Sequence, residues 1–369
     1  MTQNEVRVAW GPLKRFTREV FVRAGMSPKD AATEAGALIW ANLRGVDSHG
    51  VLRIPWYVQN IDKGVMNPRP NIKVVKETPA TLFIDADRAL GPVVTVFAVH
   101  RVIEKAKEVG IGWALVRNLT HQGALGYYSQ MIAKEGMAGI VFVCGGPNMA
   151  PYGAKAAGVA NSPIAISVPA KRHHPLNLDM ATSIAAGGKL WLAVDKGASI
   201  PEGWALDKDG NPTTDPKKYA CLLPMGEHKG SGLALMFECL SGIMAGTPLL
   251  EPTLLGSTIN IGSQGTSEVK WERPGHHTST RHNQNSVAAA IDISNFTDLE
   301  DYKDHIDNLI DGIKALPKAE GFKEILVPGE LEERTCIQRS KNGIPLPKGT
   351  VSNLRGIAER FGIKPPSGM

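Results

Sequence analysis

The feature that most constrains the fold of this chain is an alternation of short β-type runs with helical segments through its middle. Runs rich in Val, Ile and aromatic residues predict strands at 113–116, 139–143, 189–195 and 287–293. A helix is predicted between the first two of these, over 124–135. The alternation indicates a domain in which helices pack on a mixed sheet.

Both ends of the chain are helical by pattern. Ser27 is a predicted N-cap and Pro28 takes the first helical position, so we expect a helix from Pro28 to about Leu43. An apolar stripe predicts another long helix over 298–316. We place a domain boundary near residue 75, where the helical pattern gives way to β-type runs.

Charge and cysteine usage exclude several classes of protein. The formal net charge is +5, from 41 basic and 36 acidic residues spread along the chain, so nucleic-acid binding is not expected. The four cysteines lie far apart without a C-x-x-C pair, which argues against a disulfide framework or a zinc ribbon. Without a signal-type N-terminus or a run of roughly 20 apolar residues, we expect a cytoplasmic protein with no membrane contact.

The stretch from Asp47 to Tyr57 combines a hydroxyl, an imidazole, a guanidinium and a phenol. A helix beginning near Val51 would bring His49, Arg53 and Tyr57, which are four residues apart, onto one face or its N-terminal extension. A proton carrier, a carboxylate clamp and an aromatic wall on one face suit an enzyme that acts on a small acid. The alternative is a solvated, capped helix start.

Two further segments carry candidate chemistry. His121 is predicted at a strand-to-helix turn, where active-site residues are common but structural histidines also occur. The run from His228 to Gly232 opens an apolar helix and could hold a phosphate near Lys229, or be only a flexible helix start. The chain has no G-x-G-x-x-G fingerprint in its strand-turn-helix setting, so a nicotinamide cofactor would not bind in a Rossmann crevice.

Neither a metal site nor a hydrolase is predicted. The pair His173-His174 and the group His276, His277 and His282 lack metal-ligand spacing. The Ser48-His49 pair lacks the G-x-S-x-G elbow, and adjacent residues rarely face each other as nucleophile and base.

Taken together, these stretches resemble the type 2 malate/L-lactate dehydrogenase-like oxidoreductases. That family includes sulfolactate and ureidoglycolate dehydrogenases, diketogulonate reductase and the piperideine- and pyrroline-2-carboxylate reductases. The matching segments follow family order over nearly the whole chain: Asp47 to Arg53, Asn118 with His121, Gly123 to Ala124, Gly126 to Tyr128, Asn161 to Ala165, Asp179 to Ser183, Gly203 to Asp207, Lys229 to Ala234, Pro328 to Glu330 and Gly343 to Leu346.

The resemblance implies an α+β fold of two domains. Residues 76–295 would form a non-Rossmann NAD(P)-binding domain with a largely antiparallel sheet. Residues 1–75 and 296–369, the two chain ends, would form a helical domain. Members of such a family are homodimers or larger assemblies, so we expect a homodimer or higher homo-oligomer.

The resemblance also assigns candidate site residues. The catalytic candidates are His49, His121 and Ser48, with either histidine as proton carrier. Arg53 and Tyr57 would face the substrate, together with Gly145, which lies where the chain departs from the family pattern and loses a side chain. The cofactor would contact His121, Gly123, Ala124, Leu125, Asp179, Met180, Ala181, His228, Lys229, Gly230, Pro328, Gly329 and Glu330.

The implied activity is an NAD(P)-dependent oxidoreductase that moves a hydride between nicotinamide and C2 of a small 2-hydroxy or 2-oxo acid. Alternatives are reduction of a cyclic imino acid and a non-catalytic binding protein on the same fold. Either NAD or NADP fits, with NAD slightly favoured. The run from Lys171 to His174 offers charge to a 2′-phosphate, but it is equally consistent with a solvated loop.

Overall fold

A seven-stranded sheet forms the centre of the computed structural model, which describes residues 5–255, 259–261, 267–269 and 283–369. Neighbouring strands are antiparallel, apart from the parallel pair β3 and β4. The prediction of a largely antiparallel sheet is therefore confirmed. In spatial order the strands are β2 (Lys73–Glu77), β3 (Thr81–Asp85), β4 (Ile111–Leu119), β13 (Gln284–Asp292), β5 (Met137–Gly145), β6 (Ile164–Val168) and β7 (Leu176–Met180).

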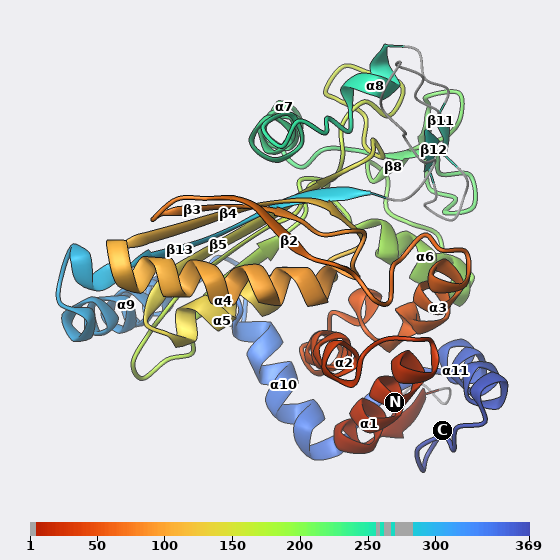
Figure 1. Cartoon of the computed structure of the whole chain (residues 1–369), viewed down its shortest axis with the longest axis horizontal. Helices are drawn as coiled ribbons and strands as arrows, with labels where there is room; N and C mark the ends of the chain where they lie inside the picture. Colours follow the sequence, from red (N-terminus) through yellow and green to blue (C-terminus); the bar gives the residue numbers. More distant parts are fainter. Residues whose placement is uncertain (1–4, 256–258, 262–266, 270–282) are drawn as a thin grey trace.

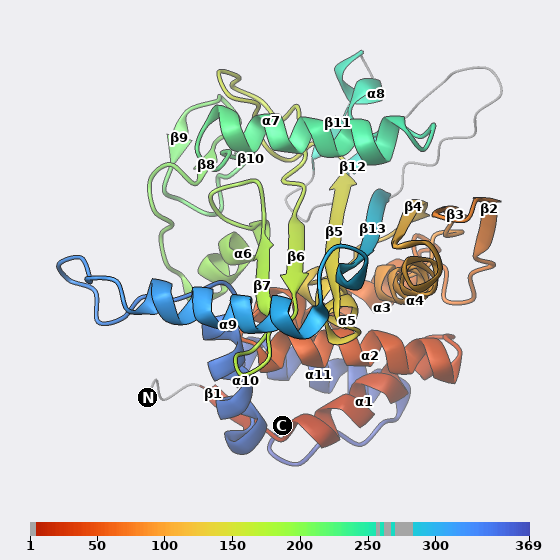
Figure 2. The ribbon, with the colours of Figure 1, turned by 90° about the vertical axis from the view of Figure 1, so that its left-hand side faces the viewer.

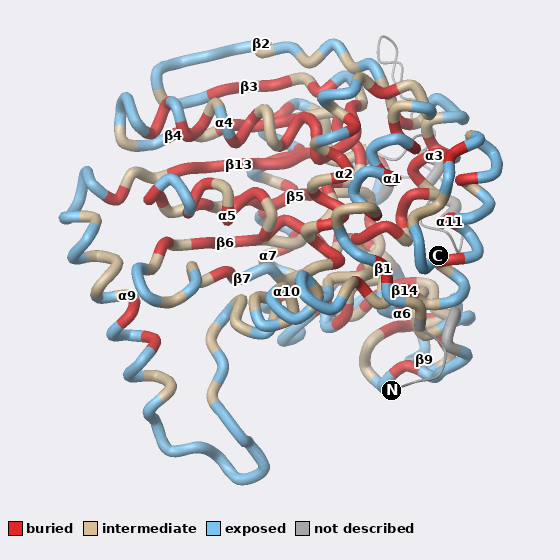
Figure 3. The backbone as a smooth tube through the Cα atoms, turned by 90° about the horizontal axis from the view of Figure 1, so that it is seen from below, coloured by how far each residue is buried: buried red, intermediate tan, exposed pale blue. Residues whose placement is uncertain are grey.

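Helices cover both faces of this sheet. On one face α4 (Gly91–Val109) and α5 (Gly126–Lys134) pack on an apolar layer that includes Ala114 and Val116 (Figure 1). On the other face α7 (His228–Phe237) packs through Phe237, whose ring stacks on Phe142 at 4.6 Å. The alternation of apolar residues along β4 thus supplies one core to each face. Figure 3 shows the inner strands buried and β2 exposed at the edge.

The chain ends meet beside the sheet. β1 (Glu5–Val8) pairs with β14 (Ile344–Pro347), and one apolar core joins α1 (Trp10–Arg23), α2 (Pro28–Leu43), α3 (Ile54–Asp62) and α11 (Lys348–Phe361). By contrast, α9 (Leu299–Lys314) lies along the sheet, and α10 (Glu330–Asn342) runs from there to the chain-end helices (Figure 2). The division into 1–75 with 296–369 and 76–295 stays a prediction.

Local signals placed several helices correctly. The predicted helix over Pro28–Leu43 is α2, and the Ser27 side chain accepts a hydrogen bond from the backbone N–H of Asp30, as an N-cap should. The strand predicted at 189–195 is wrong, because this run belongs to helix α6 (Gly187–Lys196). A short apolar run does not distinguish a strand from a buried helix by periodicity.

The helix predicted from Val51 begins three residues later. Two 3-10 turns, Asp47–His49 and Val51–Arg53, precede α3 at Ile54. Gly50 separates the turns in an extended conformation, and a Cβ there would lie 2.2 Å from the Asn42 carboxamide oxygen. That oxygen accepts a hydrogen bond from the Val51 N–H, so α2 holds the turns in place.

Several short elements lie in the same part of the molecule as α7 (Figure 2). They are β8 (Ala205–Leu206), β9 (Pro212–Thr213), β10 (Cys221–Leu222), a π-helical turn (Glu238–Ile243) that continues α7, α8 (Glu251–Leu254), β11 (Ile259–Ile261) and β12 (Ser267–Val269). In the part of the chain that the structure describes, no helix has the length and apolar character needed to cross a membrane.

Candidate active site

A cavity lies between the 3-10 turns after α2, helix α6 and the loop that follows β5. It encloses about 1160 Å³ of empty space, part of which opens to solvent. Among the predicted site residues, five line this cavity: His49, Arg53, His121, Gly123 and Gly145. These residues come from segments up to 96 positions apart in sequence (145 minus 49), so folding has gathered them.

Arg53 provides a buried positive charge at the cavity. Its side chain is 6% exposed, its Nε–H donates to the Ser48 carbonyl at 2.8 Å, and its guanidinium lies 4.4 Å from the Trp191 ring. Burial lowers the pKa of Arg53 from its usual value. Within the described part of the chain, no carboxylate forms an ion pair with Arg53. A buried guanidinium of this kind favours an anionic ligand.

The two histidines stack at the cavity wall with different partners. Their ring centroids are 5.5 Å apart and their planes differ by 14°. The Nδ1 atom of His49 lies 2.9 Å from the Ser48 hydroxyl, whereas the Nδ1 atom of His121 lies 2.6 Å from the Tyr57 hydroxyl. Burial, with a contribution from the Arg53 charge, lowers the pKa of His49 to about 3. His49 is therefore neutral near pH 7.

Tyr57 stands behind His121. It is 1% exposed and belongs to the apolar core of the chain-end helices, and it is not among the residues that line the cavity. Burial raises the pKa of Tyr57 well above its ordinary value, so its hydroxyl stays protonated. Its hydroxyl contacts the catalytic candidate His121.

Several cofactor candidates form a packed cluster at the start of α5. Asp179 on β7 accepts a hydrogen bond from the Gly126 N–H at 2.8 Å, and burial raises the pKa of Asp179 to about 6. The Asn177 N–H donates to the Pro328 carbonyl at 3.1 Å, and Gly329 lies against Asn177. Gly126 follows directly on the cofactor candidates Ala124 and Leu125 in the chain. The start of α5, strand β7 and the 328–330 turn therefore meet beside these two residues.

The start of α7 lies at the end of β7. Gly230 packs so closely on the backbone of Thr182 and Met225 that a Cβ would lie 2.3 Å from the Thr182 carbonyl oxygen. Thr182 follows Met180 and Ala181, which brings these cofactor candidates beside the helix start. His228 and Lys229 are exposed in this first turn.

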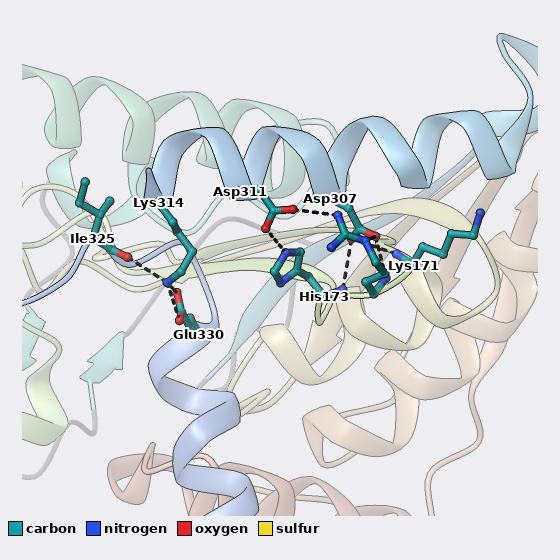
Figure 4. A network of polar contacts seen from close by, with 8 residues as sticks. Lys171, His173, Asp307, Asp311, Lys314, Ile325 and Glu330 are labelled. Atoms are coloured by element: carbon teal, nitrogen blue, oxygen red, sulfur yellow. Dashed lines mark hydrogen bonds and ion pairs between the residues drawn. The ribbon is translucent and has the colours of Figure 1, made fainter. Parts of the chain in front are cut away.

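The basic run from Lys171 to His173 is bound to α9 (Figure 4). Lys171 pairs with Asp304 at 2.9 Å, and both Arg172 and His173 contact Asp311, at 2.8 and 2.7 Å. The buried carboxylate of Asp307 accepts hydrogen bonds from three backbone N–H groups of the same run. These charges are thus matched by acids of this chain.

Glu330 is also held within the chain. Its carboxylate lies 2.7 Å from Lys314 Nζ (Figure 4). It also accepts a hydrogen bond from the Val327 N–H. Burial acts to raise the pKa of Glu330, whereas its hydrogen bonds with Lys314, Val327 and Arg334 act to lower it, and the net effect is a lowered pKa. Glu330 therefore stabilises the 328–330 turn.

Most of the other residues that line the cavity were not predicted as site residues, among them Trp191, Ser162 and Gln284, whereas Gln122 lies within the 121–125 segment expected to contact the cofactor. Trp191 covers Arg53, while the buried side-chain oxygens of Gln122, Ser162 and Gln284 have no hydrogen-bond partner among the described residues. The segment from Asn161 to Ala165 matches a family motif, but that match did not assign a role to Ser162. No local signal marks these positions, because only the fold brings them to one cavity.

Among the described residues, no group of three or more His, Cys, Asp or Glu side chains is placed to bind an ion. His276, His277 and His282 lie outside the described residues. The four described cysteines are free thiols.

Known proteins resemble this chain over almost its full length. L-sulfolactate dehydrogenase from Methanocaldococcus jannaschii is 39% identical over 352 residues, covering 95% of this chain and 96% of the relative. Malate dehydrogenase from Pyrococcus horikoshii is 37% identical, covering 98% and 97%, and its solved structure has a TM-score of 0.84 over 99% and 98% of the two chains. Ureidoglycolate dehydrogenase (NAD(+)) from Escherichia coli K12 is 29% identical, covering 92% and 93%.

Similarity of this extent identifies an enzyme of the dehydrogenase class. The chain belongs to the malate/L-lactate dehydrogenase family, whose model matches residues 8–355, so the predicted resemblance is confirmed.

Proposed function

We propose that this enzyme interconverts a small 2-hydroxy acid and the corresponding 2-oxo acid with a nicotinamide cofactor. The observation that carries the proposal is the buried Arg53 guanidinium, without a carboxylate partner in the described chain, beside two histidines. Because Nε is used by the Ser48 carbonyl, the two Nη groups are the ones that would bind a substrate carboxylate as a fork. The names of the relatives, which include sulfolactate, malate and ureidoglycolate dehydrogenases, support the same substrate class.

His121 is the proposed proton carrier. Tyr57 occupies Nδ1 of His121, so Nε2 is the ring nitrogen that would exchange a proton with the 2-oxygen of the substrate. His49 is poorly suited to this role, because burial and the Arg53 charge oppose its protonated form. His49, held by the Ser48 hydroxyl, would instead orient the substrate and pack on His121.

The described residues fit a nicotinamide cofactor. The buried oxygens of Gln122, Ser162 and Gln284, which lack partners in the described chain, suit the amide and hydroxyl groups of such a molecule. At the start of α7, Lys229 and the helix N-terminus would hold a phosphate. When bound, the cofactor supplies or accepts the hydride at C2.

NAD is the proposed form of the cofactor. The run from Lys171 to His173, which offered charge to a 2′-phosphate, is paired with Asp304, Asp307 and Asp311 of α9. The printed name of the Escherichia coli relative, which includes NAD(+), agrees with this choice.

The proposed partner in assembly is a second copy of the chain, bound through α7 and its π-helical continuation. Phe237 faces the sheet, while Met236, Leu240 and Ile243 on the outer side are 50%, 42% and 53% exposed. Three large apolar side chains at i, i+4 and i+7 form a stripe that a symmetric partner would cover. Leu240→Asp should shift the sedimentation of the protein from dimer to monomer, with Glu19→Gln on the surface of α1 as the control. A wild-type monomer at micromolar concentration would refute this interface.

The catalytic proposal is tested by reduced-nicotinamide absorbance with NAD and NADP against a panel of 2-oxo acids and cyclic imino acids. Faster turnover of 2-oxo acids with NAD is expected. Preference for the imino acids would establish the alternative reductase, and no turnover of any compound would favour a non-catalytic binding protein.

A further inference from the structure

A buried carboxyl group lies behind the candidate catalytic residues. Glu34 on α2 is 0% exposed, and neither of its carboxyl oxygens has a hydrogen-bond partner among the described residues. Buried polar groups are paired in the great majority of cases, so this position needs an explanation. Burial raises the pKa of Glu34 to about 8, which makes it a neutral acid at pH 7.

Three tyrosines on neighbouring helices are within electrostatic reach of Glu34. They are Tyr57 on α3 and Tyr127 and Tyr128 on α5; burial raises the pKa of each phenol, and the charge of Glu34 raises it further. The Tyr127 hydroxyl reaches the same helix, because it lies 3.3 Å from the Cβ that Gly36 would carry. Glu34 is therefore the acid of a phenol cluster that adjoins the active site.

Two arginines near α2 are paired with other carboxylates, whereas Arg53 and Asp179 act on the same phenols as Glu34. Arg44, at the end of α2, pairs with Glu333 at 2.8 Å, and Arg339 of α10 pairs with Asp47 at 2.7 Å. From the 3-10 turn after Gly50, Arg53 acts on the pKa of Tyr57 in the direction opposite to Glu34. No described cation pairs with Glu34 itself, so its charge state is felt by the phenols.

We propose that Glu34 is a positioning residue that sets, through Tyr57, how strongly His121 holds its proton. The inference rests on the proposed function, in which His121 exchanges a proton with the 2-oxygen. The connection is structural: the Tyr57 hydroxyl lies 2.6 Å from His121 Nδ1, and Tyr57 belongs to the same apolar core as residues of α2.

The two charge states of Glu34 favour opposite directions of the reaction. While Glu34 is neutral, it adds no negative charge that would hold the proton on His121, and His121 gives its Nε2 proton more readily to the 2-oxygen as C2 of the oxo acid gains a hydride. Once Glu34 is ionised, its buried charge stabilises protonated His121. His121 then takes the hydroxyl proton of the hydroxy acid more readily while C2 loses a hydride to the nicotinamide.

The pH profile of hydroxy-acid oxidation tests this role. In the wild type we expect kcat/KM to rise several-fold, and at most about tenfold, around pH 8, since a one-unit increase in the pKa of His121 strengthens it as a base by no more than that factor. Glu34→Gln keeps the shape of the side chain but cannot ionise, so that rise should disappear while oxo-acid reduction at pH 7 persists. Glu19→Gln on α1 is the matched surface control and should keep the wild-type profile. Superimposable profiles of the wild type and Glu34→Gln would overturn the proposal.

Infrared spectroscopy tests Glu34 without relying on activity. The wild type at pH 7 should show the carbonyl band of a protonated carboxylic acid, and the band should vanish as the pH passes 8 and be missing in Glu34→Gln. Absence of the band from the wild type would overturn the proposal even if the variant did not fold. An enzyme that shows the band but turns over no acid would instead disprove the proposed function.

Discussion

Replacing Arg53 with lysine tests the carboxylate clamp. The guanidinium donates Nε–H to the Ser48 carbonyl, which leaves two Nη groups for a substrate carboxylate. An ammonium group cannot form the same fork, so at least one charge-assisted hydrogen bond is lost. Such a bond contributes roughly 1.5 to 3 kcal/mol, which corresponds to an increase in KM of about 10- to 150-fold.

The assay is the initial rate of change in reduced-nicotinamide absorbance at saturating cofactor, with the best acid varied. Arg360→Lys is the matched control, because Arg360 forms a fork with Asp62 at 2.7 Å for both contacts, on the protein surface away from the cavity. We expect Arg53→Lys to raise KM while kcat falls less, and Arg360→Lys to leave both unchanged. An unchanged KM in Arg53→Lys would refute the assignment of the clamp.

Three further predictions concern His121, Glu34 and Asp307. His121→Ala should lower kcat by about 10²- to 10⁴-fold, more than His49→Ala does in the same rate assay, because only His121 is placed to carry the proton; the reverse order would reassign that role. The free energy of unfolding of the wild type, measured in urea relative to Glu34→Gln, should fall between pH 4.5 and about pH 8 by about 1.4 kcal/mol per pH unit. The sign follows because the folded state holds the Glu34 proton more tightly than the unfolded chain, and a difference independent of pH would contradict it. Asp307→Asn should lower the melting temperature by a few degrees, since its carboxylate accepts three backbone N–H groups from 171–173, and an unchanged calorimetric transition would show that this anchor contributes nothing.

Local chemistry explains which elements could be predicted. The N-cap at Ser27 and the proline after it act within one turn, so the bounds of α2 follow from neighbouring residues. The α6 segment was wrongly predicted as a strand, because its apolar run fits either a strand or a helix. Only packing against the rest of the protein decides between the two. The start of α3 was also misplaced, since the Asn42 side chain, eight residues before Gly50, holds that turn.

The candidate site was likewise only partly predictable from the sequence. Its residue types were visible in the sequence, and five of the predicted residues do line one cavity. The pairing of Tyr57 with His121, which are 64 residues apart, had no local signal. The cover that Trp191 forms over Arg53 also depends on α6 reaching the turns after α2.

The stretch around Ser48, His49 and Arg53, with the ordered motifs after it, was enough to identify the family and its kind of chemistry. Those properties depend on the identity of side chains, which a sequence states directly. The tertiary structure decided that His49 is buried beside a cation while His121 has a phenol behind it. It also left Glu34 buried without a partner in the described chain. Burial and neighbouring charge act through space, so proton affinity at this site is a property of the fold.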